Sequence, residues 1–186
     1  MIKSDNWILT QGEKLVKPFY PEKVSRGVIS YGTSQCGYDL TLNETAYYYR
    51  GNASDLIDVK DFDKNKLTMK VIAFDNYLII NSRQAMLCSV NEHLTIPNDI
   101  MGLAWGKSTY SRVEVNVYCQ PIEPGWKGYL SILVVNYNPN PVKLYVNEGI
   151  LQIVFFELDT ASKNPYKDGD KYQGQGKEPT FSKIAS

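Results

Sequence analysis

Histidine and cysteine are scarce in this sequence. The 186 residues include one histidine, His93, and three scattered cysteines, none in a CxxC pair. This argues against a disulfide framework. A Ser-His-Asp triad could use only His93, and no G-x-S-x-G elbow accompanies any serine. The H-x-E and P-C-x-x-C elements of zinc-dependent base deaminases are both absent. We therefore expect no zinc chemistry and a structural role for His93.

An excess of one charge and long apolar runs are also missing. Twenty Lys and Arg residues balance twenty Asp and Glu residues, so the formal net charge is zero, which argues against a general nucleic-acid binder. No run approaches the ~18 apolar residues of a membrane span. The N-terminal MIKSDNWILTQGEK lacks the apolar core of a signal peptide. These absences predict one cytoplasmic domain that binds neither nucleic acid nor membrane.

The pattern of apolar residues predicts a mainly β chain. Ser4 is a suitable N-cap for a short helix, and the helical pattern stops at Pro18. Short apolar runs separated by Gly, Pro, Asn and Asp then favour a sandwich or barrel over βαβ units. From Asp159 onward the sequence is polar and Gly-rich. We therefore expect a β domain over residues 1–158 and a flexible tail over 159–186 that orders on contact with a ligand. The expected strands are YDLTL, AYYYR, NYLIIN, AMLCSV, IMGLAWG, RVEVNVYC, YLSILVVNY, VKLYV and ILQIVFFEL.

Three polar segments could carry chemistry, and each has an ordinary alternative. GKSTYSR (106–112) offers cations and hydroxyls for phosphate oxygens, but it lacks P-loop spacing and could be a solvated turn. YGTSQCGYDL carries Asp39, which could bind a metal or cap a loop. KYQGQG (171–176) is rich in donors, yet it also fits plain disorder. Taken singly, these segments leave the function open.

Taken together in order, five segments resemble the dCTP deaminase family. They are ISYGTSQCGYDL, GKSTYSR, PIEPGWKG, NEGILQIVFFE and KYQGQG. The resemblance runs from IKSDNWI to the tail and extends to the superfamily shared with trimeric dUTPases. It implies a distorted β-barrel or jelly-roll-like protomer, and a homotrimer with nucleotide sites at the subunit interfaces. It also implies a deoxynucleoside triphosphate of the dCTP, dUTP or dTTP class, with Mg²⁺ carried on the triphosphate.

Position by position, the resemblance predicts a complete set of triphosphate contacts. Ser108 matches the phosphate-binding serine and Arg112 matches the site arginine. Glu123 stands where a carboxylate approaches the deoxyribose 3′-hydroxyl, and Trp126 matches a structural tryptophan of the hairpin. The other contacts implied for the triphosphate are Lys107, Thr109, Gln152, Lys171, Tyr172 and Gln175.

The expected base pocket departs from the family. Seven residues after Trp126, deaminases of this family place a glutamate, and this chain has Leu133. Without zinc, hydrolysis at C4 of cytosine needs a general base, so the loss should cost at least ~10²–10⁴-fold in rate. The loop VYCQPIEP (117–124) also differs, which leaves the identity of the base open. Its expected nucleotide contacts are Tyr118, Cys119, Gln120 and Pro121.

Glu114 is a candidate replacement for the missing carboxylate. A hairpin that turns near Pro124 would place Glu114 opposite Leu133 on the neighbouring strand, with both side chains on one face. The alternative is that Glu114 faces solvent or pairs with Arg112 or a lysine. Three functions therefore remain: a dCTP deaminase that forms dUTP and ammonia, a non-catalytic nucleotide-binding trimer that acts as sensor, decoy or protein partner, and a dUTPase-like pyrophosphatase. The third would use Glu123, although the tail lacks the arginine–phenylalanine–glycine motif of dUTPases.

Overall fold

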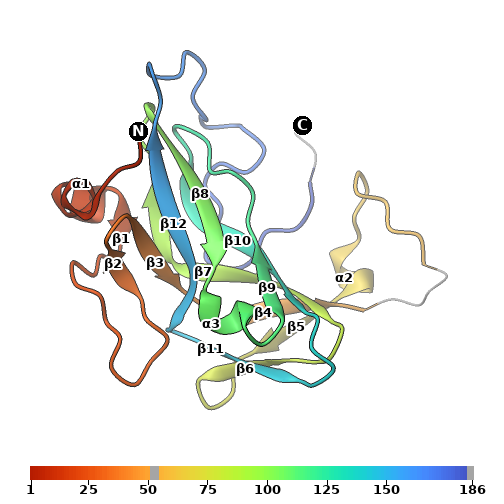
Figure 1. The fold of residues 1–186 in the computed structure, drawn as a ribbon. Helices are drawn as coiled ribbons and strands as arrows, with labels where there is room; N and C mark the ends of the chain where they lie inside the picture. Colours follow the sequence, from red (N-terminus) through yellow and green to blue (C-terminus); the bar gives the residue numbers. More distant parts are fainter. Residues whose placement is uncertain (51–54, 184–186) are drawn as a thin grey trace.

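The computed structural model describes residues 1–50 and 55–183 and is mainly β (Figure 1). Its helices are α1 (Asp5–Gln11), the 3-10 helix η1 (Gly12–Lys14), α2 (Lys64–Leu67) and α3 (Ser108–Ser111). Its strands are β1 (Val16–Lys17), β2 (Gly32–Ser34), β3 (Gly37–Thr41), β4 (Thr45–Tyr49), β5 (Thr68–Ile72), β6 (Tyr77–Ile80), β7 (Ala85–Thr95), β8 (Ile100–Gly106), β9 (Val115–Tyr118), β10 (Lys127–Asn136), β11 (Val142–Tyr145) and β12 (Gly149–Glu157). The short N-terminal helix and the β architecture are confirmed. Ser4 is the N-cap of α1, but its side chain makes no capping hydrogen bond.

Two antiparallel sheets form the body of the domain. The larger has the order β5-β4-β7-β10-β9, with β1 added against β7. The smaller has the order β2-β3-β12-β8, and in Figure 1 it lies in front of the larger one. Strands β11 and β6 form a separate two-stranded ribbon. This arrangement is the jelly-roll-like fold that the family resemblance implies, and it agrees with the sandwich or barrel that the residue pattern favours.

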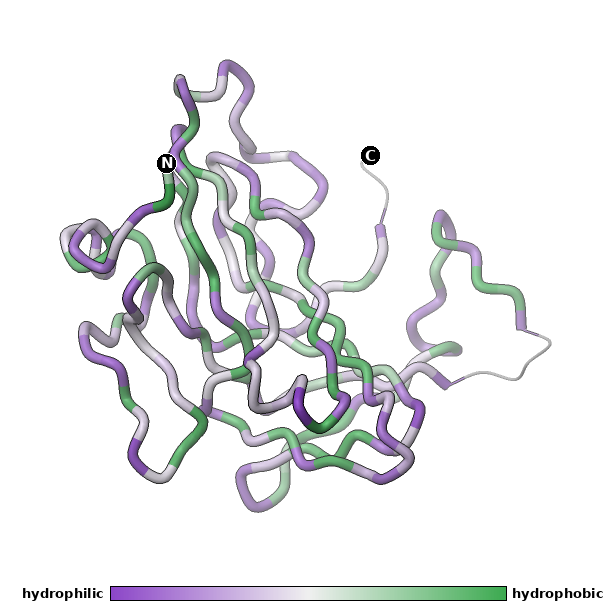
Figure 2. The backbone as a smooth tube through the Cα atoms, viewed as in Figure 1, coloured by the Kyte–Doolittle hydropathy of each residue, from purple (hydrophilic) through white to green (hydrophobic). Residues whose placement is uncertain are grey.

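Strand β10 shows how the core and the site share one element. Its residues alternate strictly between buried and partly exposed, because successive side chains of a strand point to opposite faces. Leu130, Ile132 and Val134 enter the hydrophobic core between the sheets. Ser131 and Leu133 therefore face away from that core. Figure 2 shows hydrophobic residues concentrated along the central strands of the described part of the chain.

No helix among the described residues has both the length and the hydropathy that crossing a membrane requires. His93, the single histidine, packs edge-on against Tyr129 at 5.3 Å between ring centroids. Burial lowers the pKa of His93, with a smaller contribution from Lys127. Both observations fit the structural role expected from the sequence.

A buried carboxyl group joins the two sheets. Glu92 of β7 is fully buried, and it accepts hydrogen bonds from the backbone N–H and the hydroxyl of Thr41 in β3, at 2.9 and 2.8 Å. Burial raises the pKa of Glu92 to about 7, against the opposing effect of these hydrogen bonds. The carboxyl group therefore takes up a proton in the folded protein at a pH where the unfolded chain has already lost it.

Glu92 should make the protein less stable as the pH rises from about 5 to about 8. Between the ordinary pKa of a glutamate and about 7, the folded state binds the proton and the unfolded state does not, so stability falls with pH. The full loss of stability is about 3 kcal/mol. Glu92→Gln should flatten this slope in urea unfolding at pH 5, 6, 7 and 8. Because His93 titrates in both proteins, the difference isolates Glu92, and parallel slopes would contradict the assignment.

Candidate functional site

A cavity of about 360 Å³ lies beside β10, between the loop that follows β9 and the C-terminal segment. It brings together most of the residues expected around the base and the sugar. The expected residues that line it are Tyr118, Cys119, Gln120, Pro121, Glu123, Trp126, Leu133, Tyr172 and Gln175. Leu87, Leu130 and Ile122 add apolar surface. The cavity is therefore mainly apolar, with a few amide and hydroxyl groups.

The turn of the β9–β10 hairpin holds the cavity loop in place. Trp126 is buried, and its indole N–H donates to the carbonyl of Tyr172 at 2.8 Å, which ties the hairpin to the tail. Gly125 has a φ of +82°, and a Cβ there would lie 2.6 Å from the carbonyl oxygen of Tyr166. The turn thus needs glycine both for its backbone conformation and for the close approach of the tail. The structural role expected for Trp126 agrees with these contacts.

Leu133 lies in the wall of this cavity. It faces away from the core and is paired with Leu87 on β7 and Tyr118 on β9. Among the described lining residues, Glu123 is the one carboxylate. Burial raises the pKa of the Cys119 thiol to about 12, so this group is neutral near pH 7. Leu133 therefore offers the cavity no proton acceptor, and the neutral Cys119 thiol adds none near pH 7.

The register of the hairpin overturns the expectation for Glu114. Leu133 pairs with Tyr118, whereas Glu114 precedes Val115, which pairs with Asn136 at the far end of β9. Glu114 is exposed, and it has a φ of +59° in the turn before the strand. The prediction that Glu114 lies opposite Leu133 is therefore wrong. The physical reason is that the hairpin pairing is centred between Gly125 and Trp126 rather than near Pro124.

Three of the residues expected around the phosphates lie at α3. Ser108 and Thr109 are exposed at its start, and Arg112 is its C-cap. Tyr110 anchors the helix, because its buried ring carries a hydroxyl that accepts the N–H of Tyr145 at 3.0 Å. None of these residues lines the cavity described above.

Strand β9 separates the expected site residues of α3 from those that line the cavity. The helix α3 precedes its Val115 end, whereas the cavity adjoins its Tyr118 end. A strand of this length spans about 13 Å. A single chain therefore places Ser108, Thr109 and Arg112 at one end of β9, and the base-binding candidates at the other end together with Tyr172 and Gln175 of the tail.

Lys107 and Gln152 are both bound to polar groups of their own chain. The ammonium of Lys107 lies 2.6 Å from the carboxylate of Asp39 and 3.0 Å from the hydroxyl of Ser30. The amide of Gln152 donates to the hydroxyl of Ser34 at 2.6 Å. Asp39 thus forms an ion pair rather than the metal site or loop cap considered from the sequence. The described residues contain no group of three His, Cys, Asp or Glu side chains that could hold a metal ion.

The segment KYQGQG lies against the start of β10. Gly174 donates to the carbonyl of Lys127 at 2.9 Å, and Tyr129 donates to the carbonyl of Gln175 at 3.0 Å. Gly128 allows this contact, because a Cβ there would lie 2.8 Å from the nitrogen of Gln175. Tyr172 and Gln175 enter the cavity wall, while Lys171 does not. The last three positions of the expected tail, 184–186, lie outside the described residues.

The fold is that of a dCTP deaminase. The structure of 2′-deoxycytidine 5′-triphosphate deaminase from Agrobacterium tumefaciens superposes with a TM-score of 0.61 at 17% identity, covering 83% of this chain. This chain spans 47% of the length of that structure.

Sequence comparison identifies the family. A family model described as dCTP deaminase-like matches residues 2–158. The dCTP deaminase of Nitrosospira multiformis is 36% identical over 182 residues, covering 94% of this chain and 95% of the relative. The dCTP deaminase of Herpetosiphon aurantiacus is 38% identical over 177 residues, covering 94% of this chain and 95% of the relative. The chain belongs to the dCTP deaminase family.

The ion pair between Asp39 and Lys107 gives a direct test of how α3 is supported. Asp39 is fully buried, and the Lys107 side chain is 13% exposed. Asp39→Asn should lower the free energy of unfolding by about 3 kcal/mol, because Lys107 loses its counter-charge. Adding Lys107→Met should recover part of that loss, since it removes the uncompensated ammonium. Urea unfolding of the three proteins measures both effects, and a double variant that loses more than the single one would contradict this account.

Proposed function

We propose that this chain binds a pyrimidine deoxynucleoside triphosphate of the dCTP, dUTP or dTTP class and does not deaminate dCTP at an appreciable rate. The observation that carries this proposal is the position of Leu133 in the wall of the cavity. Membership of the dCTP deaminase family supports binding of a deoxynucleoside triphosphate. A leucine at this position cannot act as the general base that hydrolytic deamination of dCTP requires.

The proposal places each nucleotide between two subunits of a homotrimer. One chain has its cavity and α3 at opposite ends of β9, so a neighbouring chain would supply Ser108, Thr109 and Arg112 for the phosphates. Hydroxyl, guanidinium and backbone N–H groups suit phosphate oxygens. Lys107 is held by Asp39, so we assign it to the support of this segment rather than to direct phosphate contact. Mg²⁺ would enter on the triphosphate, as part of the substrate.

Deamination without zinc would require a base that takes a proton from water as the oxygen attacks C4, and then passes a proton to the departing amine. Leucine can do neither. The neutral Cys119 thiol is a poor acceptor at pH 7, and Glu123 belongs to the loop that we assign to the sugar. The residues of the cavity can therefore bind and orient a base, while the proton transfer lacks its carrier.

Ser108→Ala combined with Arg112→Ala should weaken binding of dCTP, dUTP and dTTP by at least about a hundredfold, since charge-assisted hydrogen bonds contribute roughly 1.5–3 kcal/mol each. Isothermal calorimetry with Mg²⁺ measures the loss. Light scattering on the same samples should give the mass of three chains for both proteins. Unchanged affinity in the double variant would remove α3 from the site, and a wild-type monomer would remove the shared site.

A dUTPase-like pyrophosphatase is the second candidate, and one observation favours it. Glu123 is the one carboxylate among the described lining residues, and dUTPases use an acidic residue at that position to hold the attacking water. Chromatography of dCTP, dUTP and dTTP after incubation with the protein and Mg²⁺ separates the candidates. Unchanged nucleotides support the binding protein, dUMP supports the pyrophosphatase, and dUTP formed from dCTP supports the deaminase.

Leu133→Glu should create measurable release of ammonia from dCTP, while Leu133→Gln should not. The two variants have similar size and polarity, and only the glutamate can carry a proton. The new carboxyl lies in a mainly apolar wall, so its pKa should rise and the protein should lose some stability. A coupled ammonia assay measures activity, with thermal unfolding as the check on folding. A folded Leu133→Glu protein that binds dCTP without turnover would show that Leu133 is not the sole cause of inactivity.

A further inference from the structure

The segment 177–182, which we call the strap, continues beyond KYQGQG and passes along the same cavity. Thr180, Phe181 and Ser182 belong to the cavity lining. Pro179 is buried, and a proline restricts the conformations that the strap can adopt. The triphosphate contacts implied by the family end at Gln175, so they give this segment no role.

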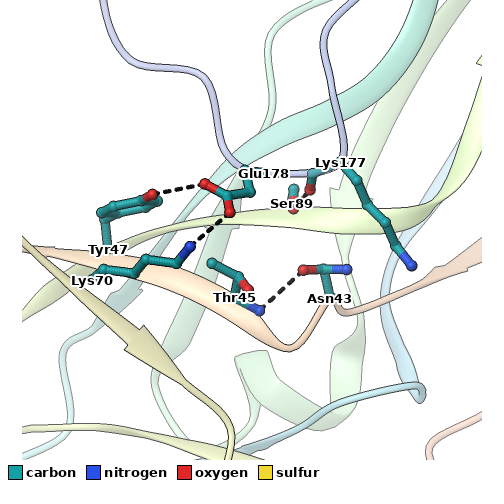
Figure 3. A network of polar contacts seen from close by, with 7 residues as sticks. All are labelled: Asn43, Thr45, Tyr47, Lys70, Ser89, Lys177 and Glu178. Atoms are coloured by element: carbon teal, nitrogen blue, oxygen red, sulfur yellow. Dashed lines mark hydrogen bonds and ion pairs between the residues drawn. The ribbon is translucent and has the colours of Figure 1, made fainter.

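Glu178 fixes the strap to the larger sheet (Figure 3). Its carboxylate accepts a hydrogen bond from the Tyr47 hydroxyl of β4 at 2.9 Å, and it pairs with the Lys70 ammonium of β5 at 2.6 Å. The hydrogen bond from Lys70, followed by that from Tyr47, lowers the pKa of Glu178. The hydroxyl of Ser89 in β7 also donates to the carbonyl of Lys177 at 2.6 Å. The strap is therefore attached to three neighbouring strands just before it reaches the cavity.

Two aromatic rings, those of Tyr47 and Phe62, hold the side chain of Phe181 in place. Its ring lies edge-on to Tyr47 at 4.8 Å and stacks with Phe62 at 5.7 Å between centroids. The same Tyr47 thus contacts both Glu178 and Phe181. Aromatic pairs of this geometry contribute about 0.5–1.5 kcal/mol beyond the area that they bury.

The strap contacts the part of the cavity wall that Ser131 and Leu133 form, and not helix α3. The N–H of Thr180 donates to the hydroxyl of Ser131 at 2.8 Å. Ser131 and Leu133 are two residues apart on β10, so their side chains point to the same face. The strap therefore crosses beside the position where the family places its catalytic glutamate, whereas α3 lies at the other end of β9.

We propose that the strap is a fixed wall of the base pocket, in which Phe181 contacts the base and Glu178 is a positioning residue. The inference rests on the proposed nucleotide binding, and it assigns to 177–182 a role distinct from closure over the triphosphate. Together with Leu87 and Leu133, Phe181 makes the pocket wall apolar where a deaminase needs a carboxylate and a water molecule.

The ion pair between Lys70 and Glu178 can be removed with little effect on the free energy of unfolding of the whole protein. Lys70 and Glu178 are both substantially exposed, and ion pairs at such positions contribute little to the free energy of unfolding. Glu178→Gln should therefore unfold at the wild-type temperature while hydrogen exchange in 177–182 becomes faster. Glu157→Gln is the matched control, because it breaks the ion pair with Lys3 at 2.9 Å and lies outside the strap.

The test measures affinity by calorimetry for dCTP, dUTP and dTTP, and for inorganic tripolyphosphate with Mg²⁺ in competition with them. Phe181→Ala should weaken binding of the nucleotides it recognises about tenfold, from the loss of apolar contact. It should leave competition by tripolyphosphate unchanged, and Phe181→Leu should restore part of the affinity. Glu178→Gln should weaken the same nucleotides about threefold through loss of positioning. Glu157→Gln should match the wild type in affinity and exchange.

Equal losses for nucleotides and tripolyphosphate would overturn the inference, because the strap would then act on the phosphates. Wild-type affinity in folded Phe181→Ala and Phe181→Leu would overturn it as well, and would leave the proposed function standing. A wild-type protein that binds none of the nucleotides would overturn the proposed function, and the base-contact role of Phe181 with it.

Discussion

The pairing of β10 with β7 on one side and β9 on the other determines where the site residues lie. Ile132 and Val134 point into the core, so Ser131 and Leu133 must point to the opposite face, where the cavity is. A slip of one residue would bury Leu133 and expose Val134, which the loss of core packing opposes. The apolar core thus fixes the position of the cavity, and Ile122, Trp126 and Leu130 belong to both. The same pairing sets the ends of β9 and so separates α3 from the cavity.

Local pattern predicts much of the fold, because each strand carries its own alternation and its own turn residues. The run RVEVNVYC shows where such reasoning fails. Its first half forms a turn with Glu114 at positive φ, and only Val115–Tyr118 is a strand. Alternating apolar residues say nothing about the length of the connection, so the pairing partner of Leu133 could not be read from them. The register depends on where the loop after Tyr118 folds back, and Gly125 and the tail determine that point.

The polar contacts of the site were still less accessible from the sequence. Lys107 and Asp39 are individually noticeable, but they are 68 positions apart and meet only because β3 and β8 both pair with β12. A lysine beside an expected phosphate-binding serine suggests a phosphate contact, and the sequence gives no sign that its ammonium also pairs with a buried carboxylate. The strap presents the same difficulty, because the sequence of 177–182 gives no sign that Tyr47 and Lys70 donate hydrogen bonds to Glu178.

Helix α3 and the cavity lie at opposite ends of β9, so each of these two regions has its own structural support. Leu133 faces the cavity and not the core, so a change of side chain there costs little core packing, and the leucine itself carries no charge to desolvate. Helix α3 rests on Tyr110 and on the Asp39–Lys107 pair, none of which touches the cavity. Substitutions in the cavity wall should therefore leave the support of α3 intact. Under the proposed function, an apolar wall made by Leu133 and by Phe181 of the strap is a coherent alternative to a hydrolytic centre, because neither side chain can take a proton from water.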